Sequence, residues 1–434
     1  MAIFKGSVLK PEKNLKSASI QAAVFMISFE EALRLVRDNL SPLPPQKVHL
    51  CEAIDHILAE DIRARVDVPG RDVSLKDGYA VRSEDVSRAS PKNPVPLRLL
   101  AECFAGESPE HALVPGGCIR VTAGAPLPKG ATAVLAEEFT SKEGQFVLAF
   151  ADAPPGKNVL LKGADITAGR LLLSRGSLLS PTKVGALAAG GISEIKVYPR
   201  PKVLLLATGD EIVAPGEPLK PGHFFASNLV TLAAWCERFG FENETRIARD
   251  EENTLKNHLS EFKSSPFEVL ITSGGAWRGP RDLILHVLHE AGWKKIFHRV
   301  RIGPGKAAAF GLLENKVVFC LPGGPPSNQM AFLTLALPGL FYLCGFEKGP
   351  FPTLPVRLKK ALKGEKGWTQ LFLGRLIKED ENFYFDPLPL KSRLSYLAEG
   401  EALVALPEGK EEIFAGEVLE ARVLEPSALF EAVL

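Results

Sequence analysis

The sequence predicts a multidomain α/β protein with a doubly wound α/β domain, an inserted β-rich domain and a C-terminal β-barrel-like domain. The 434-residue chain is 46% hydrophobic and 24% charged, which is enough apolar material for about three domains. From residue 201 to 345, apolar runs alternate with amphipathic helices, as in a parallel sheet covered by helices. Residues 67–155 and 346–434 carry short apolar runs between Pro and Gly clusters, which are typical of small β domains.

Folded structure is predicted to begin at Ser28, which forms a capping box with Glu31 at the start of an apolar-periodic helix. Residues 1–27 are predicted to be a disordered leader, and a translation start at Met1 or at Met26 stays open. The apolar stretch of this leader is too short to span a bilayer, so we expect no membrane partner.

Two short pieces, residues 28–66 and 156–200, flank the inserted domain. Each is too small to form a globule alone, so we expect them to pack together, N-terminal helix included, as an elongated dimerisation domain. The protein is therefore expected to be a homodimer. Within the insertion, strands are predicted at residues 95–100, 118–121, 133–136 and 145–150.

The α/β domain, residues 201–345, has the most regular pattern. Its strands are predicted at 202–207, 244–247, 267–272, 296–302 and 317–320. Its helices are predicted at 228–239, 253–262, 282–291 and 327–343. Gly240 and Gly292 are predicted to end two of these helices. In the C-terminal domain, the apolar runs lie at residues 370–377, 402–406 and 417–423.

The charge balance excludes one class of partner. Lys and Arg number 52 and Asp and Glu number 51, so no global basic field attracts nucleic acid, and an anionic ligand must be held locally. Six cysteines without a CxxC pair indicate free, buried thiols in a reducing compartment, so we expect a cytoplasmic protein. They are Cys51, Cys103, Cys118, Cys236, Cys320 and Cys344.

The candidate site lies in four loops that follow strands of the α/β domain, because ligands bind beyond the carboxyl ends of such strands. Glycines in these loops let main-chain N–H groups approach an anion, and Lys306 adds positive charge. The loops contain Thr208-Gly209, Ser273-Gly274-Gly275, Gly303-Pro304-Gly305-Lys306 and Pro322-Gly323-Gly324-Pro325. Asp210, Glu211 and Asp282 would repel a phosphate unless a divalent cation bridges them, so we predict that they bind Mg²⁺.

Two other patterns do not indicate a second site. Gly303, Gly305 and Ala308 imitate a dinucleotide-binding fingerprint, but the residues that follow predict a hairpin and not the required helix. His286 and His289 lack a zinc-ligand pattern and are assigned to an exposed helix face.

In this order, the four loops resemble those of the molybdopterin molybdenumtransferase family, which includes the MoeA proteins and the E domain of gephyrin. Further matching segments are residues 68–82, 119–126, 156–158 and 163–166. The resemblance implies an elongated homodimer that takes adenylylated molybdopterin, inserts molybdate and releases AMP with Mg²⁺ assistance. It also implies that other cofactor-biosynthesis proteins are partners.

The resemblance assigns roles to individual residues. Those implied in catalysis are Asp72, Asp77, Glu211, Asp282 and Lys306, with Asp72 and Asp77 closing the cleft from the insertion. The implied metal ligands are Asp210, Glu211 and Asp282. The implied contacts to the cofactor or its precursors are Thr122, Asp165, Thr208, Gly209, Ser273, Gly274, Gly275, Arg278, Pro322, Gly323, Gly324, Pro325 and Ser392.

Several family positions are changed. Gly303 replaces a lysine, Gly324 replaces an asparagine, and Trp277-Arg278 replaces small residues. One hypothesis is that Arg278 restores the lost positive charge, and the alternative is that Trp277 and Arg278 fill the pocket.

These changes leave alternative functions open. One is a catalytically divergent paralogue that binds molybdopterin or the cofactor as a carrier or assembly partner. Another is an unrelated sugar-phosphate or nucleotide enzyme on the same fold. The retained carboxylates and Lys306 favour the enzyme, because a pure binder has little need for carboxylates near a phosphate. The sequence does not choose between molybdate and tungstate, nor name the enzyme that receives the cofactor.

Overall fold

The computed structural model describes residues 26–277, 283–389 and 394–426. The chain forms two compact units, one of Pro45–Tyr198 and one that combines Met1–Pro44 with Pro199–Leu434. Within the described residues, no helix has the length and apolar character needed to cross a membrane.

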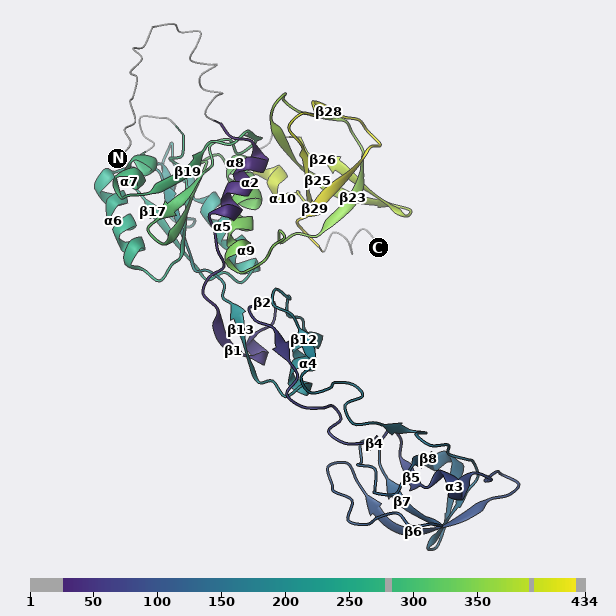
Figure 1. Ribbon diagram of the computed structural model, residues 1–434. Helices are drawn as coiled ribbons and strands as arrows, with labels where there is room; N and C mark the ends of the chain where they lie inside the picture. Colours follow the sequence, from purple (N-terminus) through teal and green to yellow (C-terminus); the bar gives the residue numbers. More distant parts are fainter. Residues whose placement is uncertain (1–25, 278–282, 390–393, 427–434) are drawn as a thin grey trace, which may run out of the picture. The chain divides into compact units, whose positions relative to one another are not determined.

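The larger unit is built on a six-stranded sheet with the order β17-β14-β18-β22-β21-β19, whose first and last strands are labelled in Figure 1. Four neighbouring strands are parallel: β17 (Asn243–Ala248), β14 (Val203–Thr208), β18 (Val269–Ser273) and β22 (Lys316–Leu321). Next, β21 (Ala309–Leu313) is antiparallel to β22 and to β19 (Lys294–His298). The doubly wound sheet is confirmed, and β21 with β22 forms the predicted hairpin.

Helices cover both faces of this sheet, so alternate residues of each strand enter different cores. On one face, a core that includes Val203 and Leu205 is covered by α5 (Ser227–Arg238), α8 (Pro325–Ala331), a π-helical turn (Phe332–Ala336) and α9 (Leu337–Leu343). On the other face, Leu204 and Leu206 pack with α6 (Glu252–Ser264) and α7 (Leu283–Glu290). Gly240 and Gly292, with φ of +68° and +90°, follow α5 and α7 as predicted.

The N-terminal helix α2 (Phe29–Asp38) begins as expected, since the Ser28 side chain accepts a hydrogen bond from the Glu31 N–H at 3.1 Å. The Glu31 carboxylate pairs with Arg34 instead of completing the capping box. The expected packing of this helix with residues 156–200 is wrong. Its buried face joins the α/β core, because Gly339 of α9 lets Val36 approach closely.

The C-terminal domain is a closed five-stranded barrel. Its strands are β23 (Thr353–Leu358), β25 (Thr369–Glu379), β26 (Asn382–Pro387), β27 (Ala402–Leu406) and β29 (Val418–Val423), and β25 closes the ring by pairing with both β26 and β27. The shorter elements are β24 (Leu362–Lys363), β28 (Glu412–Ile413) and α10 (Ser395–Ala398). The barrel-like β domain predicted from the sequence is confirmed.

One predicted strand is divided between two sheets. Residues 296–302 were expected to be continuous, but β19 ends at His298 and β20 (Ile302–Gly303) pairs with β25 of the barrel. Arg299 has a φ of +74°, which breaks extended geometry at that point. The loop after β19 is therefore joined to the barrel.

The smaller unit contains a six-stranded sheet with the order β8-β5-β7-β6-β10-β9. Its elements are β5 (Gly78–Val81), α3 (Ser83–Val86), β6 (Val95–Cys103), β7 (Gly117–Val121), β8 (Ala133–Ala136), β9 (Thr140–Glu143) and β10 (Phe146–Ala149), with a 3₁₀ turn at Glu137–Phe139. The β-rich character predicted for this region is confirmed.

The rest of the smaller unit has its own small core around a three-stranded sheet, β1-β13-β2. The strands are β1 (Gln46–His49), β2 (Ile57–Leu58) and β13 (Glu194–Tyr198), with a 3₁₀ turn at Leu50–Glu52 and the helix α4 (Pro181–Ala189). Two further pairs are β3 (Ile62–Arg63) with β12 (Leu171–Leu173), and β4 (Val73–Ser74) with β11 (Val159–Leu160). The chain enters and leaves this unit through β1 and β13, which are antiparallel neighbours.

Candidate anion-binding site

Three glycine-rich loops meet at the carboxyl edge of the α/β sheet, after the adjacent parallel strands β14, β18 and β22. The Gly274 N–H donates a hydrogen bond to the Leu321 carbonyl at 3.1 Å, which joins the second loop to the third. A Cβ atom on Gly274 would lie 2.7 Å from the Thr208 carbonyl oxygen, and one on Gly323 would lie 3.6 Å from the Gly274 Cα. The structure therefore brings these predicted site residues into direct contact.

Gly274 and Gly275 are required by this close approach. Their φ angles of +103° and +64° lie in the left-handed region, which L side chains rarely adopt. A Cβ on Gly275 would lie 3.1 Å from Thr208 Oγ1 and 3.0 Å from a methyl group of Ile284. The turn thus leaves bare backbone beside the Thr208 hydroxyl.

The Thr208 hydroxyl is the most informative atom of the site. Thr208 is 5% exposed, and within the described part of the chain its Oγ1 has no hydrogen-bond partner. Buried hydroxyl groups are nearly always hydrogen-bonded, so an unpartnered one needs an explanation. A ligand atom at the Gly274-Gly275 turn would supply the missing partner.

Two asparagines that the sequence analysis missed hold the loops together. Asn328 Nδ2, in α8, donates to Ser273 Oγ at 3.0 Å and to the Pro322 carbonyl at 2.9 Å. Asn228 Nδ2, in α5, donates to the Gly323 carbonyl at 2.8 Å and lies 3.3 Å from Ser273 Oγ. A hydroxyl that accepts from both amides still has a proton to donate to a ligand.

Carboxylates lie on one side of these loops. Asp210 and Glu211 follow β14 and are exposed. The Asp210 carboxylate accepts a hydrogen bond from the Asp250 N–H at 3.2 Å. The Glu211 carboxylate folds back over Gly209, where a Cβ would lie 2.8 Å from Oε2. Two exposed carboxylates with uncommitted oxygens are the hard ligands that Mg²⁺ prefers, so these residues fit such an ion.

Cations lie on another side, around the ring of Trp277. The Lys306 ammonium is 4.8 Å from the centroid of this ring and the Arg299 guanidinium carbon is 4.5 Å from it. Arg299 is 6% exposed and was not predicted as a site residue, because a continuous strand was expected where its φ of +74° ends β19. The loops after β18 and β19 are also joined by a 2.9 Å contact between His298 Nε2 and the Ala276 carbonyl.

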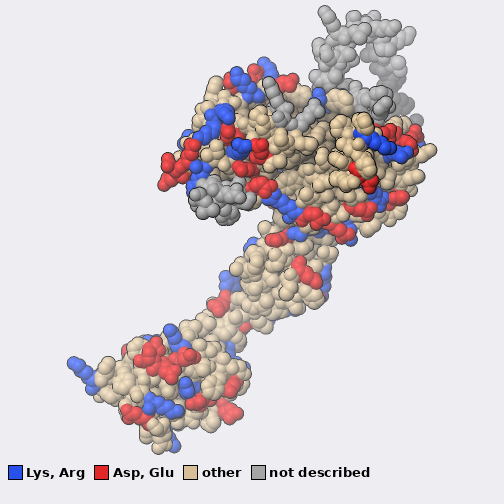
Figure 2. All heavy atoms as spheres, turned by 180° about the vertical axis from the view of Figure 1, so that it is seen from behind, with Lys and Arg blue, Asp and Glu red and all other residues tan. Residues whose placement is uncertain are grey.

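The positive charge is local, as the charge count predicted. On the face shown in Figure 2, the described basic and acidic side chains are interspersed and form no broad basic surface. An anion would therefore be held by individual groups in the loops and not by a general field.

Comparison with known proteins identifies the fold. Residues 27–191 match the MoeA N-terminal region (domain I and II), residues 204–341 a probable molybdopterin binding domain, and residues 355–424 the MoeA C-terminal region (domain IV). Molybdopterin molybdenumtransferase 2 of Mycobacterium tuberculosis is 30% identical over 400 residues, which cover 91% of this chain and 99% of that protein. The chain belongs to the molybdopterin molybdenumtransferase family. It is accordingly a transferase of molybdenum cofactor biosynthesis, as the resemblance implied.

Other relatives agree with this membership. The molybdopterin molybdenumtransferase of a Nostoc species is 33% identical over 377 residues, covering 85% of this chain and 86% of the relative. The crystal structure of a molybdopterin biosynthesis MoeA protein from Pyrococcus horikoshii has 32% identity and a TM-score of 0.79, covering 92% of this chain and 99% of that one. A second structure from that organism has 27% identity and a TM-score of 0.75.

The structure shows which atoms surround one position where this chain departs from the family pattern. Gly303 stands where the family has a lysine, and a Cβ there would lie 2.6 Å from Gln370 Oε1. Gly303 and Gln370 are partners in the β20–β25 pairing. The amide of a barrel residue therefore occupies the space beside this position in this family member. A second departure, Gly324, would meet no atom within 4 Å if it carried a Cβ.

Asp72, Asp77 and Thr122 of the insertion, together with Asp165 of the piece that follows it, all lie in the smaller unit. Asp72 Oδ1 accepts from the Lys162 N–H and Asp77 Oδ1 from the Ala123 N–H, each at 2.8 Å. Thr122 Oγ1 accepts from the Ala105 N–H at 3.2 Å. Asp165 takes part through its backbone, which donates to the Val68 carbonyl at 3.0 Å. The role of Asp72 and Asp77 in closing a cleft, and that of Thr122 and Asp165 in binding the cofactor, stay predictions.

Three predicted site residues, Arg278, Asp282 and Ser392, lie outside the described residues. The hypothesis that Arg278 restores a lost charge therefore stays a prediction, as does the metal role of Asp282. Pro322 and Pro325 frame the third loop, and Pro325 begins α8.

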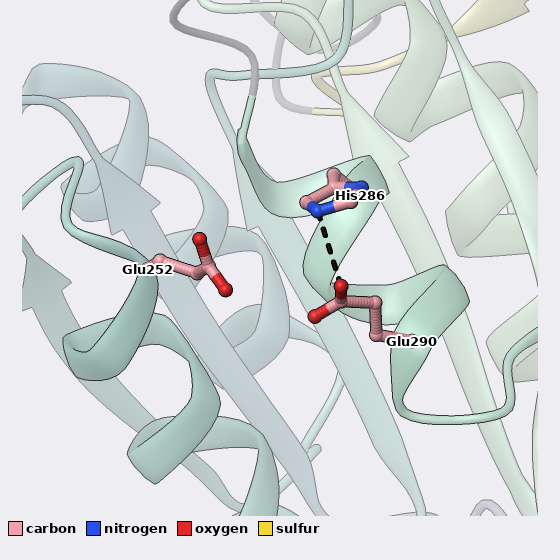
Figure 3. A group of neighbouring side chains, drawn as sticks. All are labelled: Glu252, His286 and Glu290. Atoms are coloured by element: carbon pink, nitrogen blue, oxygen red, sulfur yellow. Dashed lines mark ion pairs between the residues drawn. The ribbon is translucent and has the colours of Figure 1, made fainter.

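A second cluster of possible metal ligands, Glu252, His286 and Glu290, lies between α6 and α7 (Figure 3). The Lys256 ammonium bonds to Glu252 at 2.6 Å and to Glu290 at 2.9 Å, and these hydrogen bonds raise the pKa of Lys256. All three ligand candidates are exposed. A cation is thus already present, and the cluster is an exposed ion-pair network. His286 and His289 lie on an exposed helix face, as predicted.

Proposed function

We propose that this family member inserts molybdate into adenylylated molybdopterin and releases AMP. The observation that carries the proposal is the buried Thr208 hydroxyl, which lacks a partner in the described chain and lies beside the Gly274-Gly275 turn. A buried donor without a partner, next to bare backbone, is suited to an oxyanion that arrives as substrate. The names of the relatives support the transfer of molybdenum to molybdopterin.

The basic and hydroxyl side chains of the site would have a different role from its carboxylates. Lys306 and the Ser273 and Thr208 hydroxyls would hold oxyanion or phosphate oxygens, because charge-assisted and hydroxyl hydrogen bonds suit such acceptors. Asn228 and Asn328 would keep the Ser273 hydroxyl aimed at the ligand through their bonds to its oxygen. The chain's own contribution is thus to position an oxyanion beside the pterin pyrophosphate.

We further propose that Asp210 and Glu211, with Asp282, hold a Mg²⁺ ion. Their carboxylate oxygens are the donors that this ion takes, and like charges there would otherwise repel a pyrophosphate. When bound, the ion would neutralise phosphate charge as AMP leaves. Asp72 and Asp77, together with Thr122 and Asp165, would complete the cleft from the smaller unit.

We place this activity in a homodimer in the cytoplasm, in contact with other proteins of cofactor biosynthesis. Four large apolar side chains are exposed in the two pieces that flank the inserted sheet, residues 45–66 and 156–200: Val66, Leu161, Leu171 and Leu178. Exposed apolar side chains in pieces this small support a surface that a second copy covers. The carrier alternative has no comparable observation in its favour.

AMP release from adenylylated molybdopterin, followed by chromatography with and without molybdate and Mg²⁺, tests the proposal. We expect release that requires both additions and falls roughly 10- to 100-fold in Lys306→Ala, the range for a lost charged hydrogen bond. Lys366→Ala removes a highly exposed lysine of the barrel and should leave the rate unchanged. Tight binding of the pterin without molybdate-dependent AMP release would instead support the carrier.

A further inference from the structure

We propose that Trp277 is a positioning residue that holds Arg299 and Lys306 together as a two-cation site for a tetrahedral oxyanion. This inference rests on the proposed function and deepens it, because it names the groups that receive the oxyanion. It concerns a position where this chain departs from its family, which has a small residue in place of Trp277.

The first support is the geometry of the cluster. Both cationic groups lie within 5 Å of the centroid of one indole ring, at 4.5 Å for Arg299 and 4.8 Å for Lys306. Two like charges beside one ring repel each other, and the negative face of an aromatic ring offsets that repulsion. An anion that binds between the two groups would be attracted by both.

The second support is the fixed backbone beneath the two cations. The Arg299 N–H donates to the Ala308 carbonyl at 2.9 Å, and the Val300 N–H donates to the Lys306 carbonyl at 3.1 Å. Arg299 and Lys306 therefore begin from one loop that is closed on itself. Arg301 anchors this loop to the barrel through Glu408 at 2.9 Å. Trp277 comes from the loop after β18, so its ring brings a second loop against both cations, beside the contact between His298 and the Ala276 carbonyl.

The third support is the exposure of Trp277. Its side chain is 43% exposed, whereas a tryptophan that only fills a core is largely buried. Arg299, in contrast, is 6% exposed, and a guanidinium shielded from water interacts more strongly with both a ring and an anion. The hypothesis that Trp277 merely plugs the pocket does not explain why its ring contacts both cations.

The ligand class follows from this chemistry. A planar guanidinium and an ammonium that share one platform suit a compact dianion with several equivalent oxygens. Molybdate, tungstate and a phosphate monoester all have that form. The anion could be a metal oxyanion or a phosphate group of the pterin. Titrations with molybdate, tungstate and inorganic phosphate distinguish the two, since the anion that binds most tightly shows which class the site prefers. Either order supports the two-cation site.

The test uses the full chain and compares wild type with Trp277→Phe and Trp277→Leu. Oxyanion binding is measured by calorimetry and by indole fluorescence. Phe keeps an aromatic face, whereas Leu keeps apolar bulk without one. We expect the Leu variant to bind about tenfold more weakly and the Phe variant to stay within about threefold of wild type. The oxyanion-dependent fluorescence change of wild type should disappear in both variants.

Trp235→Phe is the matched control. The Trp235 ring also lies beside a cation, with the Arg238 guanidinium carbon 5.0 Å away, but it packs on Phe239 and Phe351 in the core. We expect this variant to keep both the affinity and the fluorescence change. Because Trp277 is partly exposed, its variants should melt close to wild type, so that a binding difference reports on the site.

The outcomes also separate this inference from the proposed function. If wild type releases AMP but Trp277→Leu binds molybdate, tungstate and phosphate as tightly as wild type, the inference is wrong and the proposed function stands. If wild type releases no AMP but oxyanion binding depends on Trp277 as expected, the proposed function is wrong and the two-cation site stands. Absence of any oxyanion binding to wild type overturns the inference.

Discussion

The Thr208 hydroxyl allows a binding role to be separated from a packing role at the level of one atom. Its neighbours Gly274 and Gly275 approach it without making a hydrogen bond to it. An unsatisfied buried hydroxyl costs about 1–3 kcal/mol, so a ligand that pairs with it would recover that free energy. The same residue type serves packing elsewhere, since Thr334 Oγ1 donates to the Met330 carbonyl at 2.6 Å.

Thr208→Val should therefore leave the melting temperature unchanged or raise it, because valine fills the same space without the unpaired hydroxyl. AMP release should fall roughly tenfold, the effect of losing one hydrogen bond to a charged ligand. Thr334→Val is the control, and it should lower the free energy of unfolding by about 0.5–1.5 kcal/mol without changing the rate. A Thr208→Val protein that melts lower but works normally would assign Thr208 to packing.

The cysteines give a prediction about reactivity and pH. Burial raises the pKa of the Cys118, Cys236, Cys320 and Cys344 thiols from 9.0 to about 12. Cys51, in contrast, is exposed. At pH 8, Ellman's reagent should label Cys51 in the folded chain and all six cysteines in denaturant.

The stability of the fold should follow the same pKa shifts. Below pH 9 these four thiols are protonated in both states, whereas between pH 9 and 12 only the unfolded chain ionises, so stability is lost as the pH rises. Urea unfolding at a series of pH values checks this. Rapid labelling of Cys320 in the folded protein, or constant stability up to pH 11, would contradict the burial.

At the scale of elements, periodicity predicted the α/β domain well because its strands and helices are buried along regular faces. It failed where one residue changes the backbone. Arg299 leaves β19 through a positive φ that arginine rarely adopts. The helix expected at 327–343 contains a π-helical turn just before Pro338, which lacks an N–H and cannot continue a regular ladder.

The candidate site could likewise be predicted only in part. Its glycine loops could be predicted, because glycine after a buried strand is a local signal. Asn228, Asn328 and Gln370 could not, because their contacts join parts of the chain that only the fold brings together. Asn228, for example, bonds to a carbonyl 95 residues away. Local patterns thus locate the loops, and tertiary structure decides which side chains hold them.

The loops themselves can be tested by adding one methyl group. Gly274→Ala places a Cβ 2.7 Å from the Thr208 carbonyl at a φ of +103°, so the loop must shift. We expect a loss of about 1–3 kcal/mol in the free energy of unfolding and nearly complete loss of AMP release.

Gly324→Ala is the matched control for this change. Its Cβ would meet no atom within 4 Å, and its φ of −70° suits alanine. The free energy of unfolding, measured in urea, should stay within about 0.5 kcal/mol of wild type. Equal effects of the two substitutions would mean that the contact between the first two loops is not tight.

At the scale of the whole molecule, the topology separates the two units cleanly. The smaller unit is one continuous segment, Pro45–Tyr198, with its own cores. Gln46 pairs with Val197 across the antiparallel strands β1 and β13, so the chain leaves this unit beside the point where it enters. The larger unit keeps its sheets, both helical layers and the barrel in the remaining residues.

Replacing residues 45–198 with a short Gly-Ser linker should therefore leave a folded protein. The neighbouring ends need only a short connection, and the closure entropy of such a loop is small. We expect this variant to melt cooperatively and to bind molybdate with the affinity of the full chain, because Thr208, Trp277, Arg299 and Lys306 are all retained. It should not release AMP, since Asp72 and Asp77 are removed.

Light scattering decides the oligomeric part of the same prediction. The full chain, of 47.0 kDa, should scatter as a particle of twice that mass, and the shortened variant as a single chain. The exposed Val66, Leu161, Leu171 and Leu178 all lie in the removed segment, so the surface assigned to the second copy is lost with it. A shortened variant that stays dimeric would place the interface in the larger unit. A full chain that is monomeric would remove the dimer from the proposal. If the shortened variant no longer binds molybdate, the oxyanion site needs the smaller unit.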